Sequence, residues 1–163
     1  MKLSHNLSKF GTASRGRGFT LIELMVTITV SVILMSVAVP SFSSFVLVQR
    51  VKATSYDVAS ALILARSEAI KRNGDVVVAP LAGGWQKGWS VSSGTDTLNK
   101  HEAMPGLTIA GPGSSVTFGS NGRLNGALSP NGFSISASND NSVTQRCVSI
   151  DLSGMPNSKT GGC

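Results

Sequence analysis

The chain has 163 residues, which is enough for one modest domain and an anchor. Its 18 glycines and its low share of charged residues, 13%, are typical of a turn-rich β domain. The net charge of +6 would fit a nucleic-acid partner, but four of the cations precede residue 19, where there is no acidic residue: Lys2, Lys9, Arg15 and Arg17. The rest of the chain has ten basic and eight acidic residues, a balance of +2. The basicity therefore indicates a targeting segment rather than a nucleic-acid-binding protein.

Residues 19–39 form an apolar segment that contains a single charge, Glu23. At about 1.5 Å per residue, a helix of this length crosses a hydrocarbon layer of about 30 Å. Positive charge before such a segment holds that end in the cytoplasm. An ionised carboxylate in lipid costs roughly 2.5 kcal/mol or more, so Glu23 needs a partner that plain anchoring does not provide.

A second helical pattern follows Pro40. Its apolar and small residues recur at spacings of three and four and therefore share one helix face: Val48, Val51, Ser55, Val58, Leu62, Ala65 and Ala69. Asn73 and Gly74 then supply a left-handed C-terminal stop. We expect one helix over about 19–73, kinked near Pro40 because proline removes a backbone donor.

After Gly74 the sequence changes to short β-like segments separated by turns rich in glycine, proline and asparagine. The predicted strands are 75–79, 87–92, 106–110, 115–118, 132–137 and 146–151. One antiparallel sheet, or two, on the amphipathic half of the helix would bury the apolar faces of both. The predicted fold is α+β, with an amphipathic helical continuation at 40–73 and a β-rich domain at 74–163.

The two cysteines, Cys147 and Cys163, both lie near the C-terminus. An anchor with its N-terminus in the cytoplasm would place them in an oxidising compartment, where a disulfide is the default expectation. Its loop of about 15 residues would contribute ~3 kcal/mol in the chain-entropy account. Two free thiols are the alternative. A metal site is disfavoured because His101 is the only histidine after residue 18.

Catalysis is not expected. The run Lys-Thr-Gly at 159–161 is similar to an element of penicillin-binding enzymes, but no Ser-x-x-Lys nucleophile motif accompanies it. A single histidine after residue 18 and the lack of a carboxylate cluster make a triad or a metal centre hard to build. We therefore predict no enzyme, no cofactor and no bound metal.

The N-terminal segment has three interpretations. A secretory signal cut after Ala38 would have an unusually long apolar region, interrupted by Glu23, and a plain signal anchor leaves Glu23 unexplained. The third interpretation rests on the run Gly-Phe-Thr-Leu-Ile-Glu at 18–23, which resembles the prepilin signal of type IV pilins and type II secretion pseudopilins. The resemblance implies that a prepilin peptidase removes residues 1–18 by cutting after Gly18 and then methylates the new N-terminal residue, Phe19. It also implies that Pro40 is the family's helix-bending proline.

The same resemblance gives Glu23 a role in assembly. In the family, the glutamate at this position pairs with the N-terminal amine of a neighbouring subunit and sets the axial register between them. Here that amine would be the one at Phe19. The alternative is a glutamate tolerated close to the membrane edge, where its carboxylate reaches the interface by snorkelling.

Two further runs resemble one branch of the family. These are residues 65–73 with the tryptophan-rich run 84–89, and the run 146–154. They are similar to the GspH/FimT branch, which includes the minor pilins FimT and FimU and the minor pseudopilin GspH. The middle of the chain, about 93–130, matches only in its β-like texture. We interpret Trp85 and Trp89 as core aromatics on a strand whose indole N–H groups find local partners.

Some members of this branch bind DNA and share a Gly-Arg-x-Arg motif after the last strand. The corresponding turn here is Gly-Met-Pro-Asn at 154–157, which has no arginine. Phosphate binding needs several clustered cations, and the weak candidates are Arg123, Arg146 and Lys159. No nucleic-acid binding is expected.

The resemblance implies a minor pilin at the tip or initiating complex of a type IV pilus, with a type II secretion pseudopilin as the alternative and a DNA-binding minor pilin as the second. Its partners would be other pilins or pseudopilins, the prepilin peptidase and an inner-membrane assembly platform. The protein would span the inner membrane once, with its C-terminal domain in the periplasm, before it enters a filament. The sequence does not name its neighbours or a ligand for residues 93–130.

Overall fold

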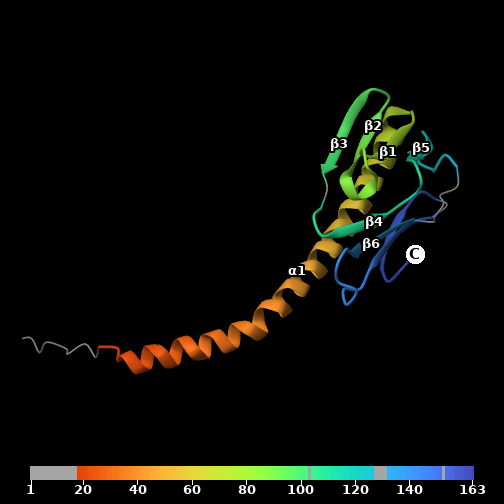
Figure 1. Ribbon diagram of the computed structural model, residues 1–163. Helices are drawn as coiled ribbons and strands as arrows, with labels where there is room; N and C mark the ends of the chain where they lie inside the picture. Colours follow the sequence, from red (N-terminus) through yellow and green to blue (C-terminus); the bar gives the residue numbers. More distant parts are fainter. Residues whose placement is uncertain (1–17, 103, 127–131, 152) are drawn as a thin grey trace, which may run out of the picture. The chain divides into compact units, whose positions relative to one another are not determined.

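The computed structural model describes residues 18–102, 104–126, 132–151 and 153–163, with only the backbone at 39 and 40. The predicted leader thus lies outside the described residues except for Gly18. The chain divides into two compact units, Met1–Val39 and Pro40–Cys163. Each unit is described by itself, and Figure 1 labels the elements.

One helix belongs to both units. α1 runs from Leu21 to Arg72, two residues later at its start and one residue earlier at its end than expected. Its end is the predicted left-handed stop: Asn73 has φ 50°. The N–H of Gly74 donates to the carbonyl of Ala69 (3.1 Å), and the N–H of Asn73 donates to that of Ile70 (3.3 Å). These two bonds define a Schellman motif, in which the left-handed residue is Asn73. The helix assignment continues through Pro40, and the kink there stays a prediction.

The first sheet is antiparallel throughout and has the strand order β3-β2-β1-β5. Its strands are β1 (Val76–Pro80), β2 (Gly88–Ser93), β3 (Asp96–Glu102) and β5 (Val116–Phe118). A short 3-10 turn, η1 (Trp85–Lys87), separates β1 from β2.

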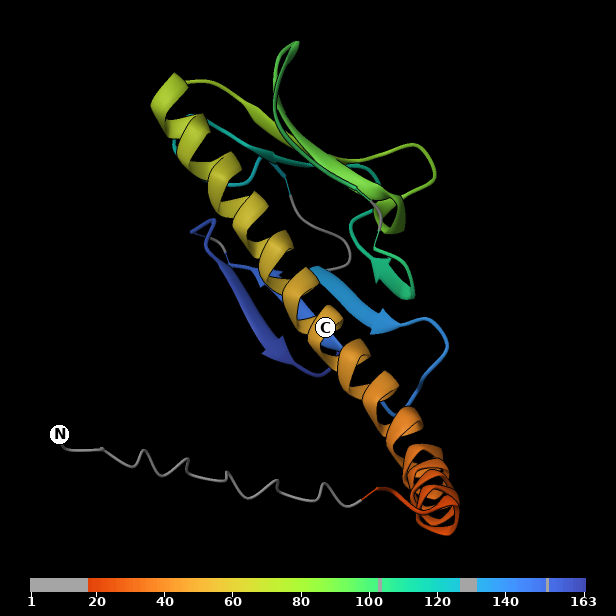
Figure 2. The same ribbon diagram turned by 90° about the vertical axis from the view of Figure 1, so that its left-hand side faces the viewer.

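The second sheet is also antiparallel and has the order β4-β6-β7-β8. Its strands are β4 (Leu107–Ala110), β6 (Gly132–Ala137), β7 (Arg146–Ile150) and β8 (Pro156–Thr160). In Figure 2 the first sheet (green) lies along the C-terminal end of α1 and the second (blue) along the part of the helix before it. The α+β prediction is confirmed, and of the two arrangements expected the structure has the one with two sheets.

A single apolar core joins the helix to both sheets. The predicted helix face is buried with one exception, Val48, which is 43% exposed. The sheets contribute alternate residues to the same core, such as Phe118 from β5 and Phe133 and Ile135 from β6, each 0% exposed. Burial of this apolar stripe is therefore the main contribution that holds this part of α1 against the sheets.

Three details differ from the sequence prediction. β3 and β8 were not predicted as strands because their sequences, DTLNKHE and PNSKT, lack an apolar alternation. Both lie at sheet edges, where one neighbouring strand supplies the backbone hydrogen bonds and little burial is needed. Trp85 is buried as expected, but it begins η1 instead of lying on a strand. Its indole N–H donates to the carbonyl of Pro112 (2.7 Å), and its ring meets Phe133 edge-on at 4.7 Å.

Candidate assembly site

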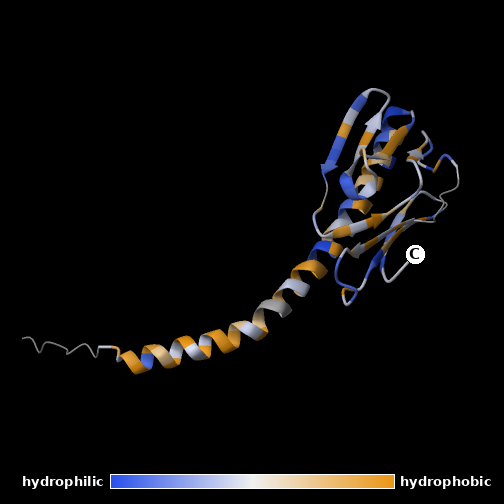
Figure 3. Cartoon of the chain, in the orientation of Figure 1, coloured by the Kyte–Doolittle hydropathy of each residue, from blue (hydrophilic) through white to orange (hydrophobic). Residues whose placement is uncertain are grey.

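The first half of α1 consists mostly of hydrophobic residues (Figure 3, orange). From Phe19 to Val37, every large hydrophobic side chain is at least half exposed. Among the described residues, α1 is the one helix long and apolar enough to cross a membrane, judged by length and composition. A helix that is apolar on every side needs lipid or other helices around it, because water would leave all of that surface unburied.

Glu23 lies in the first turn of this helix and closes a capping box with Thr20. The Thr20 N–H and hydroxyl approach the Glu23 carboxylate at 3.5 and 3.4 Å, and the Glu23 N–H donates to the Thr20 hydroxyl at 3.3 Å. The spacing Thr-x-x-Glu is the sequence signature of such a cap, although it was not among the features predicted above. The carboxylate therefore sits at the N-terminal end of the helix, where the peptide dipoles favour negative charge.

The predicted cleavage site precedes the cap. Gly18 and Phe19 have no regular secondary structure and are both exposed, and no atom of the described residues lies within 4 Å of the position that a Gly18 side chain would occupy. This geometry leaves the peptide bond between them open to an enzyme. The structure does not test the cut itself or the methylation of Phe19.

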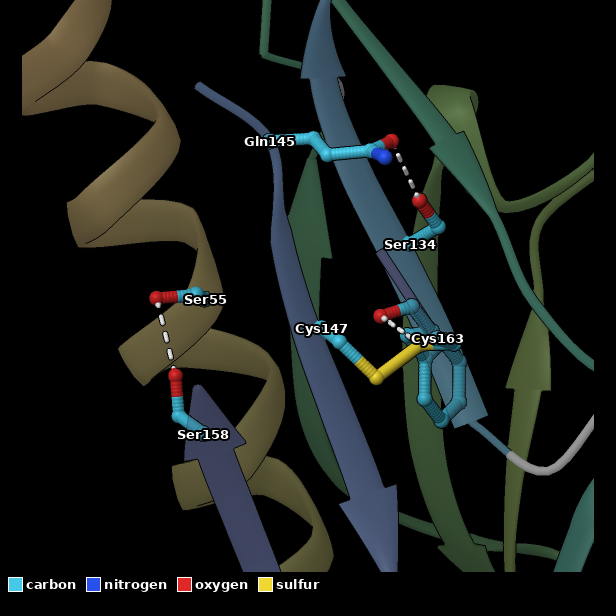
Figure 4. Close-up of a disulfide and its surroundings, with 7 residues drawn as sticks. Ser55, Ser134, Gln145, Cys147, Ser158 and Cys163 are labelled. Carbon is cyan, nitrogen blue, oxygen red and sulfur yellow. Dashed lines mark hydrogen bonds between the residues drawn. A yellow bond between two sulfur atoms is a disulfide. The ribbon is translucent and has the colours of Figure 1, made fainter. Parts of the chain in front are cut away.

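Cys147 and Cys163 form the predicted disulfide (Figure 4). Cys147 is buried on β7, and Cys163 lies three residues beyond the end of β8. The Sγ atom of Cys163 lies 3.3 Å from the carbonyl oxygen of Phe133 on β6. The tail is held a second time by a backbone bond from Gly161 to Gln145 (2.8 Å). The disulfide thus ties the residues after β8 to the two inner strands of the second sheet.

The turn between β7 and β8 is where the resemblance described above would place a Gly-Arg-x-Arg motif. Asp151 organises it, because its carboxylate accepts from the hydroxyl and N–H of Ser153 and from the N–H of Met155. The Ser153 hydroxyl is the main cause that lowers the pKa of Asp151, with smaller contributions from the two N–H groups and the charge of Arg66.

Arg66 connects this turn to the helix and to a second loop. Its Nε donates to the carbonyl of Gly122 at 3.1 Å, and its Nη1 contacts the sulfur of Met155. Gly154 is buried against the same Gly122 backbone. No sequence pattern indicates this role of Arg66, because its partners Gly122 and Met155 lie 56 and 89 positions further along the chain.

The three weak DNA-binding candidates do not form one patch. Arg146 is engaged by the hydroxyls of Ser158 (3.1 Å) and Thr160 (3.5 Å), and its guanidinium lies 5.7 Å from the centre of the Tyr56 ring. Lys159 alternates with Ser158 along β8 and so points to the other face of the sheet. Arg123 lies on the loop after β5 and is exposed. Phosphate binding by several cations at once finds no support in this arrangement.

The family model described as type II transport protein GspH matches residues 55–154, from the middle of α1 to the turn between β7 and β8. The chain belongs to the GspH family. A second model, the prokaryotic N-terminal methylation motif, matches residues 13–39. This GspH-family chain is therefore a minor pilin or pseudopilin of the type IV pilus and type II secretion group, and its motif and apolar helix indicate a membrane-anchored pilin. The proteins of this group are structural subunits that assemble with other pilins or pseudopilins.

Solved structures share the fold. The type IV minor pilin FimU of Pseudomonas aeruginosa, in two crystal forms, has TM-scores of 0.53 and 0.55 at 24% and 22% identity. The matches cover 66% and 68% of this chain and 91% and 89% of the FimU chains. The minor pseudopilin EpsH of the Vibrio cholerae type 2 secretion system matches with a TM-score of 0.48 and 15% identity, over 68% of this chain and 95% of that chain. No curated protein matches significantly.

Proposed function

We propose that the protein is a minor pilin that joins the tip or initiating complex of a type IV pilus. The observation that carries this proposal is the exposed apolar helix at residues 19–37, with Glu23 in its first turn, in a chain whose second half folds into its own core. One part of the chain has an all-round surface for other helices, and the other is a compact domain that can face outward.

Processing would remove the leader and leave a new N-terminal amine at Phe19 that can contact another subunit. In this proposal a prepilin peptidase cuts between Gly18 and Phe19 at the cytoplasmic face and methylates the new amine. The C-terminal domain waits in the periplasm, where the disulfide between Cys147 and Cys163 is stable, until the inner-membrane platform extracts the subunit.

Glu23 would then form the register contact. The new amine at Phe19 of one subunit carries positive charge, and the Glu23 carboxylate of its neighbour is the only acidic group in the apolar segment. Pairing would offset the cost of a carboxylate in a low-dielectric helix bundle. In this proposal the pairing needs the Glu23 carboxylate itself and does not depend on its hydrogen bonds to Thr20.

The test is a pair of variants, Glu23→Ala and Thr20→Val, each expressed in a strain that assembles the filament. We expect Glu23→Ala to be processed and to reach the membrane, but to enter filaments at least tenfold less than the unmodified chain, because the unpaired amine and lost contact are worth over about 1.4 kcal/mol. Thr20→Val removes the hydroxyl of the cap and keeps the carboxylate, so it should assemble nearly normally. Normal incorporation of Glu23→Ala would overturn the register role.

A pseudopilin of a type II secretion system is the second candidate, favoured by the description of the family model that matches residues 55–154. Deletion of the gene separates the two. A loss of surface pili with normal secretion supports the pilus proposal, and a loss of secreted enzymes with normal piliation supports the pseudopilus.

A further inference from the structure

The face of α1 opposite the core carries a second pattern. Three large side chains recur every seven residues and are each about half exposed: Tyr56 (53%), Ile63 (51%) and Ile70 (51%). The exposed positions between them hold the small residues Ala53, Ser60 and Ser67. Large and small residues that alternate at spacings of three and four form the seam of a parallel helix pair, in which small positions admit the partner's large side chains.

The seam residues themselves are uncharged, although each is exposed; the Arg146 guanidinium lies 5.7 Å from the centre of the Tyr56 ring, and the Ile70 side chain lies beside Gly122. A solvent-facing helix surface normally carries charged residues, and contiguous exposed apolar side chains indicate a contact surface. The hydroxyl of Ser67 donates to the carbonyl of Leu64 (2.9 Å), so this small residue presents little free polarity to a partner. The preceding positions of the same heptad series are Gln49 and Phe42, so the run of large apolar residues begins at Tyr56.

Opposite charges border the seam. Lys52 precedes Ala53 on one flank, and Asp57 follows Tyr56 on the other. Lys52 lines a cleft with Arg146 on the side of the second sheet, and Asp57 lies 3.4 Å from the Nε2 of His101 on the side of the first. In a parallel, in-register pair of helices, a residue on the first flank meets the residue five positions later on the partner's second flank. Lys52 of one copy therefore meets Asp57 of the other, twice in a symmetric pair.

The remaining flank positions do not oppose this register. Ala59 would face the partner's Leu64, an apolar contact. Arg66 would face Lys71, but its guanidinium is turned to the Gly122 carbonyl, and Lys71 is paired with Glu68 at 3.3 Å in its own chain. Lys52 and Asp57 are thus the one flank pair with unlike charges, and each copy supplies both of these residues to the other.

We propose that a second copy of this chain packs on the outer face of α1, parallel and in register, through the seam of Tyr56, Ile63 and Ile70. Parallel orientation follows from the shared N-terminal anchor, and to that extent the inference rests on the proposed function. The pair of Lys52 and Asp57 sets the register. Such a dimer would be a membrane-bound form of the subunit before it meets other pilins.

The test uses the full chain, produced with a prepilin peptidase in a host without other pilins. Ile63→Cys should give a covalent dimer on mild oxidation of the membranes, while Asn139→Cys, exposed on the loop after β6, should not. Lys52→Glu or Asp57→Lys, each combined with Ile63→Cys, should lower the cross-linked fraction roughly threefold. The double reversal Lys52→Glu with Asp57→Lys should restore it.

Two controls keep the result interpretable. Protease resistance of the C-terminal domain checks that Asp57→Lys, which also loses its His101 contact, still folds. Leader cleavage and membrane fractionation report on the proposed function independently of dimer formation. If Ile63→Cys cross-links no better than Asn139→Cys, or if the double reversal fails to restore what the single reversals lower, the proposed dimer is wrong even where processing is normal.

Discussion

Gly154 occupies the turn between β7 and β8 with φ 81°, and a side chain there would collide with the backbone of Gly122. Both features can be separated with a matched control. Gly126 has φ 97°, and among the described residues no atom lies within 4 Å of the position that a side chain would take there, so we expect Gly126→Ala to meet the conformational penalty alone, about 1–2 kcal/mol. Gly154→Ala should lower the free energy of unfolding by a further ~1–3 kcal/mol, because the neighbour is backbone and cannot move aside. Urea denaturation followed by fluorescence of the buried Trp85 and Trp89 measures both; equal losses would contradict the packing argument.

Asp151 gives the same turn a dependence on acid. Its pKa is lowered, chiefly by the Ser153 hydroxyl, so the ionised form stabilises the fold above the ordinary aspartate pKa and this contribution is lost as the pH falls through the lowered value. Ser153→Ala should therefore raise the pKa of Asp151 toward its usual range and flatten the loss of stability in acid. Carboxyl-carbon NMR titration measures the pKa, with Ser120→Ala, an exposed serine of another loop, as the control. An unchanged pKa in Ser153→Ala would show that the backbone N–H groups suffice.

At the scale of elements, the second sheet is completed by a strand of low intrinsic preference. β8 has the sequence PNSKT and pairs only with β7, and the disulfide follows it three residues later. We expect the double variant Cys147→Ser with Cys163→Ser to lose about 3 kcal/mol, since the unfolded chain is no longer closed into a loop. Hydrogen exchange should locate the change: faster exchange over β8 with protection retained in β1 and β2. Uniform loss across both sheets would mean that the disulfide supports the whole core instead of one edge.

The elements also show what could be predicted from sequence. The helix, its stop at Asn73 and six strands follow from periodicity and turn residues, because apolar burial creates those signals directly. β3 and β8 carry no such signal, since an edge strand is held by backbone hydrogen bonds to one neighbouring strand and needs little apolar burial. At the candidate site, the Thr-x-x-Glu spacing from Thr20 to Glu23 indicates the capping box. The role of Arg66 has no such signature, because it depends on how the 119–125 and 151–155 loops meet the helix.

At the scale of the whole molecule, charge is divided by position along the chain. Most of the excess of cations precedes the predicted cut. Of the ten lysines and arginines after residue 18, three form ion pairs with carboxylates: Lys71 and Arg72 with Glu68, Arg72 also with Asp96, and Lys100 with Glu102. An N-terminus removed in processing would take most of the net charge with it. The remaining chain carries nearly equal numbers of positive and negative side chains, and such a surface suits contacts with other proteins better than binding to a polyanion.

This balance leads to the last prediction, which concerns DNA. Arg123, Arg146 and Lys159 are separated, so the processed chain in detergent should not shift duplex DNA at micromolar concentration in about 150 mM salt. The turn at 154–157 provides a gain-of-function control, because Met155 and Asn157 are exposed there and Arg66 and the 119–125 loop lie beside Met155 and Gly154. Met155→Arg with Asn157→Arg would add two cations to that end of the domain and should produce binding that weakens steeply with salt. Thr95→Arg with Asn139→Arg, equal in charge but placed in the turn between β2 and β3 and in the loop after β6, should produce less. Strong, salt-sensitive binding by the unmodified chain would contradict the argument from dispersed charge and return DNA uptake to the candidate functions.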